Sequence, residues 1–135
     1  MTEVLQPILP PRKTQIRPSP IDGYGVFATE DIAEGEVFEQ CPFVVIGAQS
    51  EESPLWHFQH SYPKTSGRFL VMPIFGFGCA YNSSLNPNAT WYELPNRKVF
   101  EYKAIKNIKA GEEIYVDYSE SVYDPEAVQN FRKDG

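Results

Sequence analysis

The sequence contains few metal-binding side chains and no long apolar run. Its 135 residues include two cysteines and two histidines, too few for a zinc cluster, and His57 and His60 have no third ligand at metal-site spacing. No stretch reaches the ~18 apolar residues of a membrane-spanning helix, and the N-terminus lacks the apolar segment of a secretory signal peptide. We therefore expect no metal and no membrane partner. We also expect an intracellular protein, in the cytoplasm or, in a eukaryotic host, the nucleus, with reduced thiols.

Basic residues are also in the minority. The chain has 12 Lys and Arg against 18 Asp and Glu, a net charge of −6 and a pI near 4.9. Direct nucleic-acid binding is disfavoured, because phosphate recognition requires a basic surface. The charge favours a basic partner such as a lysine-rich peptide. The alternative is that it serves only solubility.

Long helices are excluded by the spacing of 12 prolines and 9 glycines. The length corresponds to one domain, and 41% apolar with 22% charged residues is typical of a globular chain. We predict a mainly β domain of short strands joined by turns.

The chain divides into three parts. Residues 1–14 contain three prolines and no periodic pattern, which predicts an extended leader. Residues 15–120 form the domain, and residues 121–135 form a polar tail in which Asp124-Pro125 could start a short helix. Predicted strands cover 15–17, the segment from 26, a buried run at 42–46, 68–74, and a hairpin of 90–94 with 98–103.

One short pattern occurs twice. Ala28–Glu36 reads ATEDIAEGE and Ala104–Glu112 reads AIKNIKAGE. In both, Ala precedes Gly by seven residues, Ile precedes it by three, and an apolar strand follows. We predict two related units, each a strand, a tight turn with Gly at positive φ and a returning strand. The alternative is chance recurrence of a common turn.

Three blocks contain the candidate functional residues: DGYGVFA at 22–28, GFGCAYNSSLNPNA at 76–89 and GEEIYVDY at 111–118. Taken alone, the first is typical of a hairpin turn and the second of a loop. Tyr118 alternates with Ile114 and Val116, which fits a core tyrosine. In this order and spacing, however, the blocks resemble the SET-domain family of protein lysine methyltransferases, over roughly residues 15–120. The resemblance is greatest to small stand-alone proteins of viral or bacterial type.

The resemblance implies a SET-domain (β-clip-like) fold of several small curved sheets, with little helix and a knot-like C-terminal crossing. It implies methyl transfer from S-adenosylmethionine to a lysine of a histone or other basic protein, and so a role in modifying chromatin or host proteins. The block Gly23-Tyr24-Gly25 matches the turn that contacts the cofactor, and Asn82 with Ser83 matches the family's Asn-His pair. Tyr118 matches the tyrosine that faces the transferred methyl group, and Tyr24 would line the channel with it.

Many family members close this channel with a zinc-binding tail, but no cysteine cluster follows Tyr118 here. Aromatic residues of this chain or a second subunit would have to close it, so a homodimer fits as well as a monomer. Candidate residues for the channel wall are Trp91, Tyr92, Tyr123 and Phe131.

One departure from the family pattern leaves an alternative open. Ser83 stands where the family has histidine, which would lower cofactor affinity if the imidazole ring matters. The chain could then be a SET-fold module of weak or absent activity that binds a peptide or the cofactor. A third possibility is a β-rich binding module that resembles the family by chance.

Overall fold

A computed structural model describes residues 7–47, 50–55, 58–62, 64, 69–94 and 98–120. These residues form nine strands and one 3-10 turn: β1 (Thr14–Pro18), β2 (Tyr24–Ala28), β3 (Val37–Val45), β4 (His60–Tyr62), β5 (Phe69–Pro73), β6 (Asn82–Ser83), β7 (Ala89–Leu94), β8 (Val99–Ala104), β9 (Glu113–Val116) and η2 (Tyr118–Glu120).

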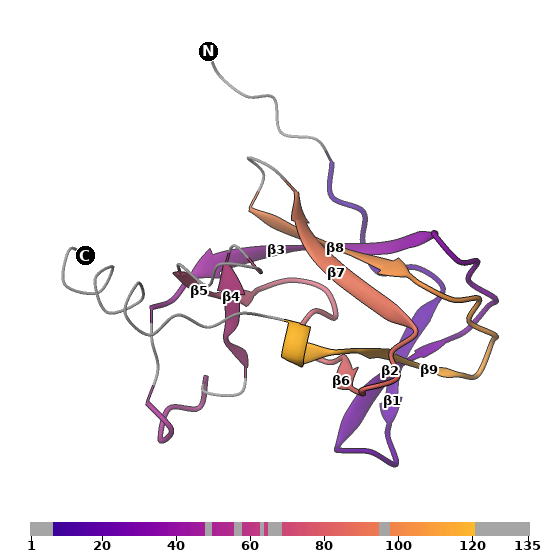
Figure 1. Ribbon diagram of the computed structural model, residues 1–135, viewed down its shortest axis with the longest axis horizontal. Helices are drawn as coiled ribbons and strands as arrows, with labels where there is room; N and C mark the ends of the chain where they lie inside the picture. The colour runs from indigo at the N-terminus through magenta and orange to yellow at the C-terminus, as the bar shows by residue number, and fades with distance from the viewer. Residues whose placement is uncertain are drawn as a thin grey trace.

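The strands form two sheets. One has the order β1-β2-β9-β6 and the other the order β4-β5-β3-β8-β7. Figure 1 shows the long β3 and β8 side by side across one part of the molecule, with β1, β2 and β9 below them. The buried side chains of both sheets form one core, whose largest members are Trp91, Tyr102, Phe38 and Phe100. The predicted mainly β fold of small curved sheets is confirmed.

The two copies of the repeated pattern pack against each other. Gly35 N–H donates to Ala104 O (2.8 Å), and Gly111 N–H donates to Ala28 O (2.7 Å). Ile32 and Ile108 exchange two hydrogen bonds of 2.8 Å each. Each of these backbone hydrogen bonds of one turn therefore has its counterpart in the other, and both glycines have positive φ (+86° and +93°).

This arrangement corrects one detail of the prediction. The strand that enters each turn does not pair with the strand that leaves it. Instead β2 pairs with β9 and β3 pairs with β8, all antiparallel. Each strand of one unit thus pairs with a strand of the other unit. The turns 28–36 and 104–112 each connect one sheet to the other.

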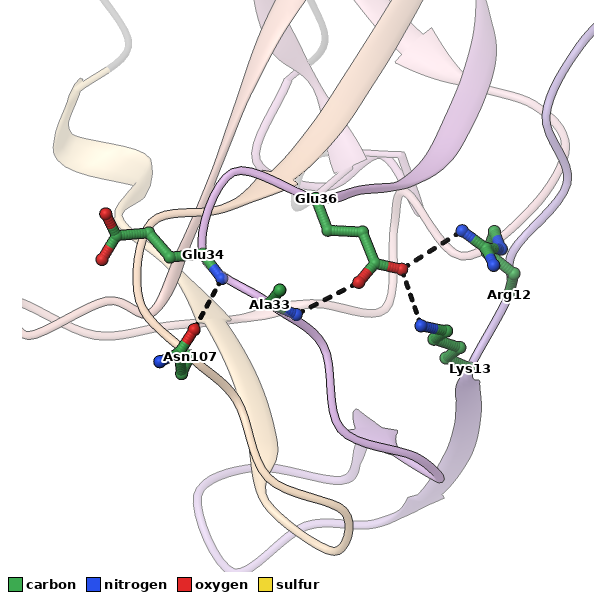
Figure 2. Close-up of polar contacts among 6 residues, drawn as sticks. All are labelled: Arg12, Lys13, Ala33, Glu34, Glu36 and Asn107. Atoms are coloured by element: carbon green, nitrogen blue, oxygen red, sulfur yellow. Dashed lines mark hydrogen bonds and ion pairs between the residues drawn. The ribbon is translucent and has the colours of Figure 1, made fainter.

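The segment before β1 lies along β3. Gln40 N–H donates to Leu9 O (2.8 Å), and Arg12 N–H donates to Phe38 O (3.1 Å). Figure 2 shows how Glu36 holds this segment: its carboxylate lies 3.1 Å from the Arg12 guanidinium and 2.9 Å from the Lys13 ammonium. Backbone contacts with the domain therefore begin upstream of residue 15.

Two further strand predictions can be compared with the structure. The hairpin is confirmed, because β7 and β8 pair from Ala89↔Ala104 to Leu94↔Val99. The run at 42–46 was predicted to be a buried strand: it is in a strand as far as Val45, but the predicted burial is wrong. It is the end of the nine-residue β3, and Val44 and Val45 are exposed there.

The Asn-rich segment lies against the C-terminal strand. The short β6 pairs with β9 in parallel, Asn82 opposite Tyr115 and Ser83 opposite Val116. Asn88 fixes the crossing, because its side chain accepts from Tyr115 N–H (2.8 Å) and donates to Glu113 O (2.9 Å). Within the described ranges, no helix is long and apolar enough to cross a membrane. The same residues contain no group of three or more His, Cys, Asp or Glu that could hold a metal ion.

Candidate active site

A cavity of about 390 Å³ brings the three sequence blocks together. It opens between the β1–β2 turn, the segment that leads into β6, and η2. Its lining residues are Asp22, Gly23, Tyr24, Phe58, Cys79, Ala80, Tyr81, Asn82, Ser83 and Tyr118. Five of the predicted site residues are therefore neighbours here, although 94 positions separate Tyr24 from Tyr118 in the sequence (118 − 24).

Asn82 is held by a buried carboxylate. Its Nδ2 donates to Glu113 Oε2 (2.8 Å), and Ser19 Oγ donates to the two oxygens of the same carboxylate (2.8 and 2.9 Å). Glu113 is only 6% exposed. No sequence pattern indicated this role, although Glu113 belongs to the Gly-Glu-Glu block at 111–113.

The two glycines that flank Tyr24 serve different purposes. Gly23 has φ +46° and open space where a Cβ would stand, so its backbone can be approached from the cavity. At Gly25 a Cβ would overlap with Glu113 and Asn82. Gly25 is therefore required by the packing of the protein itself, and it is not among the lining residues of the cavity.

Tyr118 is held at both ends. Its backbone N–H donates to Ser83 Oγ (3.1 Å), and its hydroxyl donates to Tyr81 O (2.8 Å). Burial raises the pKa of the Tyr118 hydroxyl well above its usual range, so the group stays protonated. Ser83, the departure from the family pattern, thus positions the backbone of Tyr118.

Behind Tyr118 lies an aromatic cluster. The Tyr118 ring centroid is 5.4 Å from that of Trp91 and 5.5 Å from that of His60. Trp91 is 1% exposed, and the Lys64 ammonium lies 3.8 Å from its ring centroid. Trp91 therefore supports Tyr118 from the core and does not line the cavity. Burial lowers the pKa of His60, which favours a neutral structural histidine.

The other predicted channel residues have different locations. Tyr92 is half-buried on β7, and its hydroxyl donates to Glu101. It does not line the cavity. Tyr123 and Phe131, like His57 and the predicted C-terminal helix, lie outside the described residues.

A second buried carboxylate supports the segment that leads into Asn82. Glu39 on β3 is fully buried and accepts from Phe77 N–H (2.6 Å) and from the Tyr81 hydroxyl. A Cβ at Gly76 would overlap with it. Burial raises the pKa of Glu39 to about 7. Glu39 thereby fixes the segment 76–81, and no sequence motif indicated this.

The chain resembles known proteins in sequence and structure. Residues 23–119 match the family model of the SET domain. A Plasmodium falciparum protein named as a histone methyltransferase is 30% identical, with a TM-score of 0.64 over 78% of this chain and 92% of that one.

Two further structures share the fold. The methyltransferase domain of human PR domain-containing protein 2 is 23% identical, with a TM-score of 0.56 over 84% of this chain and 78% of that one. The Neurospora SET-domain protein DIM-5, a histone lysine methyltransferase, is 20% identical, with a TM-score of 0.59 over 82% of this chain and 54% of that one. A search of curated sequences gives no match. The match over residues 23–119 and the shared fold establish that the chain belongs to the SET-domain family.

Proposed function

We propose that the protein transfers a methyl group from S-adenosylmethionine to the side chain of a lysine in a protein. Membership of the SET family and its methyltransferase structural relatives support methyl transfer in general. The observation that supports the specific reaction is the convergence of Gly23, Tyr24, Asn82 and Tyr118 on one cavity.

The residues around the cavity fit a cofactor that carries positive charge. Asp22, Tyr24 and Tyr81 are among its lining residues, and carboxylates and aromatic rings both attract cations. The amide nitrogen of Asn82 is committed to Glu113, which leaves its Oδ1 to accept a hydrogen bond. We therefore assign the cofactor to Gly23, Tyr24, Gly25, Asn82 and Ser83, with Tyr118 beside its methyl group.

S-adenosylmethionine, when bound, supplies an electrophilic methyl group on a sulfonium. The lysine must arrive as a neutral amine, although its ordinary pKa is near 10.4. A narrow site removes water from the amine, which disfavours the ammonium form. Tyr24 and Tyr118 would align the amine for in-line attack.

The Tyr118 hydroxyl orients the reactants and does not act as a base. Its proton is donated to Tyr81 O, so its oxygen is available to accept weak C–H···O contacts from a methyl group or a hydrogen bond from the amine. We expect Tyr123 and Phe131 of the tail, or a second copy of the chain, to complete the channel.

The proposal is tested by incubating the protein with methyl-labelled cofactor and a panel of lysine-rich proteins and peptides, histones included. We expect label on lysine, mapped by mass spectrometry, and none on matched peptides in which arginine replaces lysine. Cofactor binding without transfer to any substrate would contradict the proposal. It would favour the alternative of a non-catalytic SET-fold module, which the serine at position 83 motivates.

A further inference from the structure

A second, apolar cavity of about 340 Å³ lies beside the candidate active site. Its lining residues are Leu55, Phe58, Met72, Pro73, Ile74, Phe75, Gly76 and Cys79. Phe58 and Cys79 line both cavities. The two cavities therefore share a wall. A peptide whose lysine reaches the first cavity would bring the side chains that flank this lysine near the second.

Large apolar side chains are exposed at this cavity. Phe75 is 68% exposed, and Phe58 and Ile74 are 39% exposed each. A group of exposed apolar side chains is typical of a binding site. The backbone beneath it is fixed, because Ile74 N–H donates to Pro42 O (2.9 Å) and Phe77 N–H donates to Glu39 (2.6 Å). The cavity is therefore formed before any partner arrives.

We infer that this cavity takes a bulky apolar side chain of the same peptide whose lysine enters the candidate active site. The inference rests on the proposed function and specifies its substrate. The shared residues Phe58 and Cys79 place this cavity next to the one that we assign to the cofactor and the reacting lysine, so it lies within reach of residues that flank that lysine. The segment that leads to Leu55 carries the exposed Glu51 and Glu52, and their charge suits a basic peptide. The preferred substrate is thus a basic peptide with a leucine, methionine or phenylalanine near the target lysine.

The test is a set of lysine peptides in which leucine or phenylalanine replaces serine at one position at a time, up to four residues on either side of the lysine. We expect kcat/KM to rise about tenfold or more at one position, as is usual for filling an apolar pocket. Phe75→Ser should remove this preference. The matched control is Leu85→Ser, because Leu85 is 88% exposed and lines neither cavity. Equal kcat/KM for all peptides in the wild-type protein would overturn the inference.

A binding measurement separates this inference from the proposed function. The same peptides, with methionine in place of the target lysine, are titrated by fluorescence anisotropy. The chain has two cysteines, of which Cys41 is buried and Cys79 exposed, so maleimide labelling of Cys79 reports whether the shared wall is covered.

Tighter binding of the apolar peptides, loss of that binding in Phe75→Ser and protection of Cys79 would support the cavity even if no methyl transfer occurred. Binding that ignores the apolar side chain would overturn it, whether or not the protein is an enzyme. A dimer in sedimentation that Phe75→Ser converts to a monomer would assign the cavity to a second copy. Faster Cys79 labelling in Tyr123→Ser or Phe131→Ser without peptide would assign it to the chain's own tail. Either result would also overturn the inference.

Discussion

The turn Ala28–Glu36 and the turn Ala104–Glu112 have the same backbone but different surroundings. In the first, the carboxylate that follows the glycine accepts from Ala33 N–H and also binds Arg12 and Lys13. In the second, Glu112 accepts from Lys109 N–H, and no ion pair is found for it among the described residues. The backbone hydrogen bonds are thus common to both turns, while the side-chain contacts differ: only the first turn binds the segment before β1.

The strands that leave the two turns differ more. The first turn leads into β3, where Glu39 is buried and supports the segment 76–81. The second leads into β9 and η2, where Glu113 binds Asn82 and Tyr118 enters the cavity. Both carboxylates pack where a glycine leaves space, Gly76 and Gly25 respectively. Both units therefore support the site, and each supplies one tyrosine to the proposed chemistry: Tyr24 at the start of β2 and Tyr118 after β9.

The largest effect is expected from Tyr118→Phe, which changes the second unit at the proposed reaction centre. Loss of the hydroxyl should reduce methyl transfer at least about 100-fold, the usual scale for one positioned polar group. The cost in stability should be only about 1 kcal/mol, because a single hydrogen bond is lost. Label transfer and thermal unfolding measure the two effects.

A destabilised variant of the first turn, Gly35→Ala, is the control for Tyr118→Phe. It should keep its activity per folded molecule, since Gly35 lies outside the cavity. Full activity in Tyr118→Phe would contradict the role assigned to Tyr118. Loss of folding would make it a core residue with a necessary hydrogen bond.

The next effect concerns the pH dependence of stability. Burial raises the pKa of Glu39 from 4.5 to about 7 in the folded protein, so the folded state retains a proton that the unfolded chain has lost. The contribution of Glu39 to the free energy of unfolding should therefore be greatest below about pH 4.5 and should fall by up to about 3 kcal/mol as the pH rises through 7. Urea unfolding of Glu39→Gln across this range should lack this decline. A profile identical to that of the wild type would contradict the assignment.

Substitution of Gly35 and Gly111 tests whether the two turns contribute equally to stability. Gly35→Ala and Gly111→Ala each force a side chain into positive φ with nothing within 4 Å of the new Cβ. Each should lower the free energy of unfolding by about 1–2 kcal/mol, from backbone strain alone. Chemical unfolding of the two variants should give equal losses. A clear inequality would show that the turns are not energetically equivalent.

The smallest effect should distinguish the two glutamates. The pKa of Glu36 is lowered by its contacts with Lys13, with the N–H of Ala33 and with Arg12. Its stabilising contribution is therefore present above pH 4.5 and lost as the pH falls. Glu36→Gln should cost less than about 1 kcal/mol at neutral pH, and high salt should reduce that cost further. Glu112→Gln, without ion pairs in the described region, should show no salt dependence, and an equal salt dependence would contradict the comparison.

The sequence predicts local features of this fold better than long-range ones. The β7–β8 hairpin and the glycines at positive φ follow from turn chemistry and periodicity. The exchange of strand partners between the two units does not, because the paired residues are far apart in the sequence, from 57 positions for Pro42↔Val99 to 88 for Val26↔Ile114, and leave no local signal.

The site shows the same limit. Asn82, Tyr24 and Tyr118 could be predicted because they lie in recognisable blocks. The role of Glu39 could not be predicted, because a single glutamate in an apolar strand does not indicate its distant hydrogen-bond donors, Phe77 N–H and the Tyr81 hydroxyl. Trp91 was predicted for the channel wall because it is aromatic and near the Asn-rich turn, but the structure places it behind Tyr118.

The most direct measurement is a calorimetric titration of the protein with S-adenosylmethionine and, separately, with S-adenosylhomocysteine, repeated with Asn82→Ala. We predict saturable one-site binding of both ligands, weakened about tenfold or more in the variant, because Asn82 is assigned to the cofactor. Absence of heat, together with an unchanged Tm at millimolar ligand with and without a basic peptide, would contradict the cofactor site on which the proposed function rests.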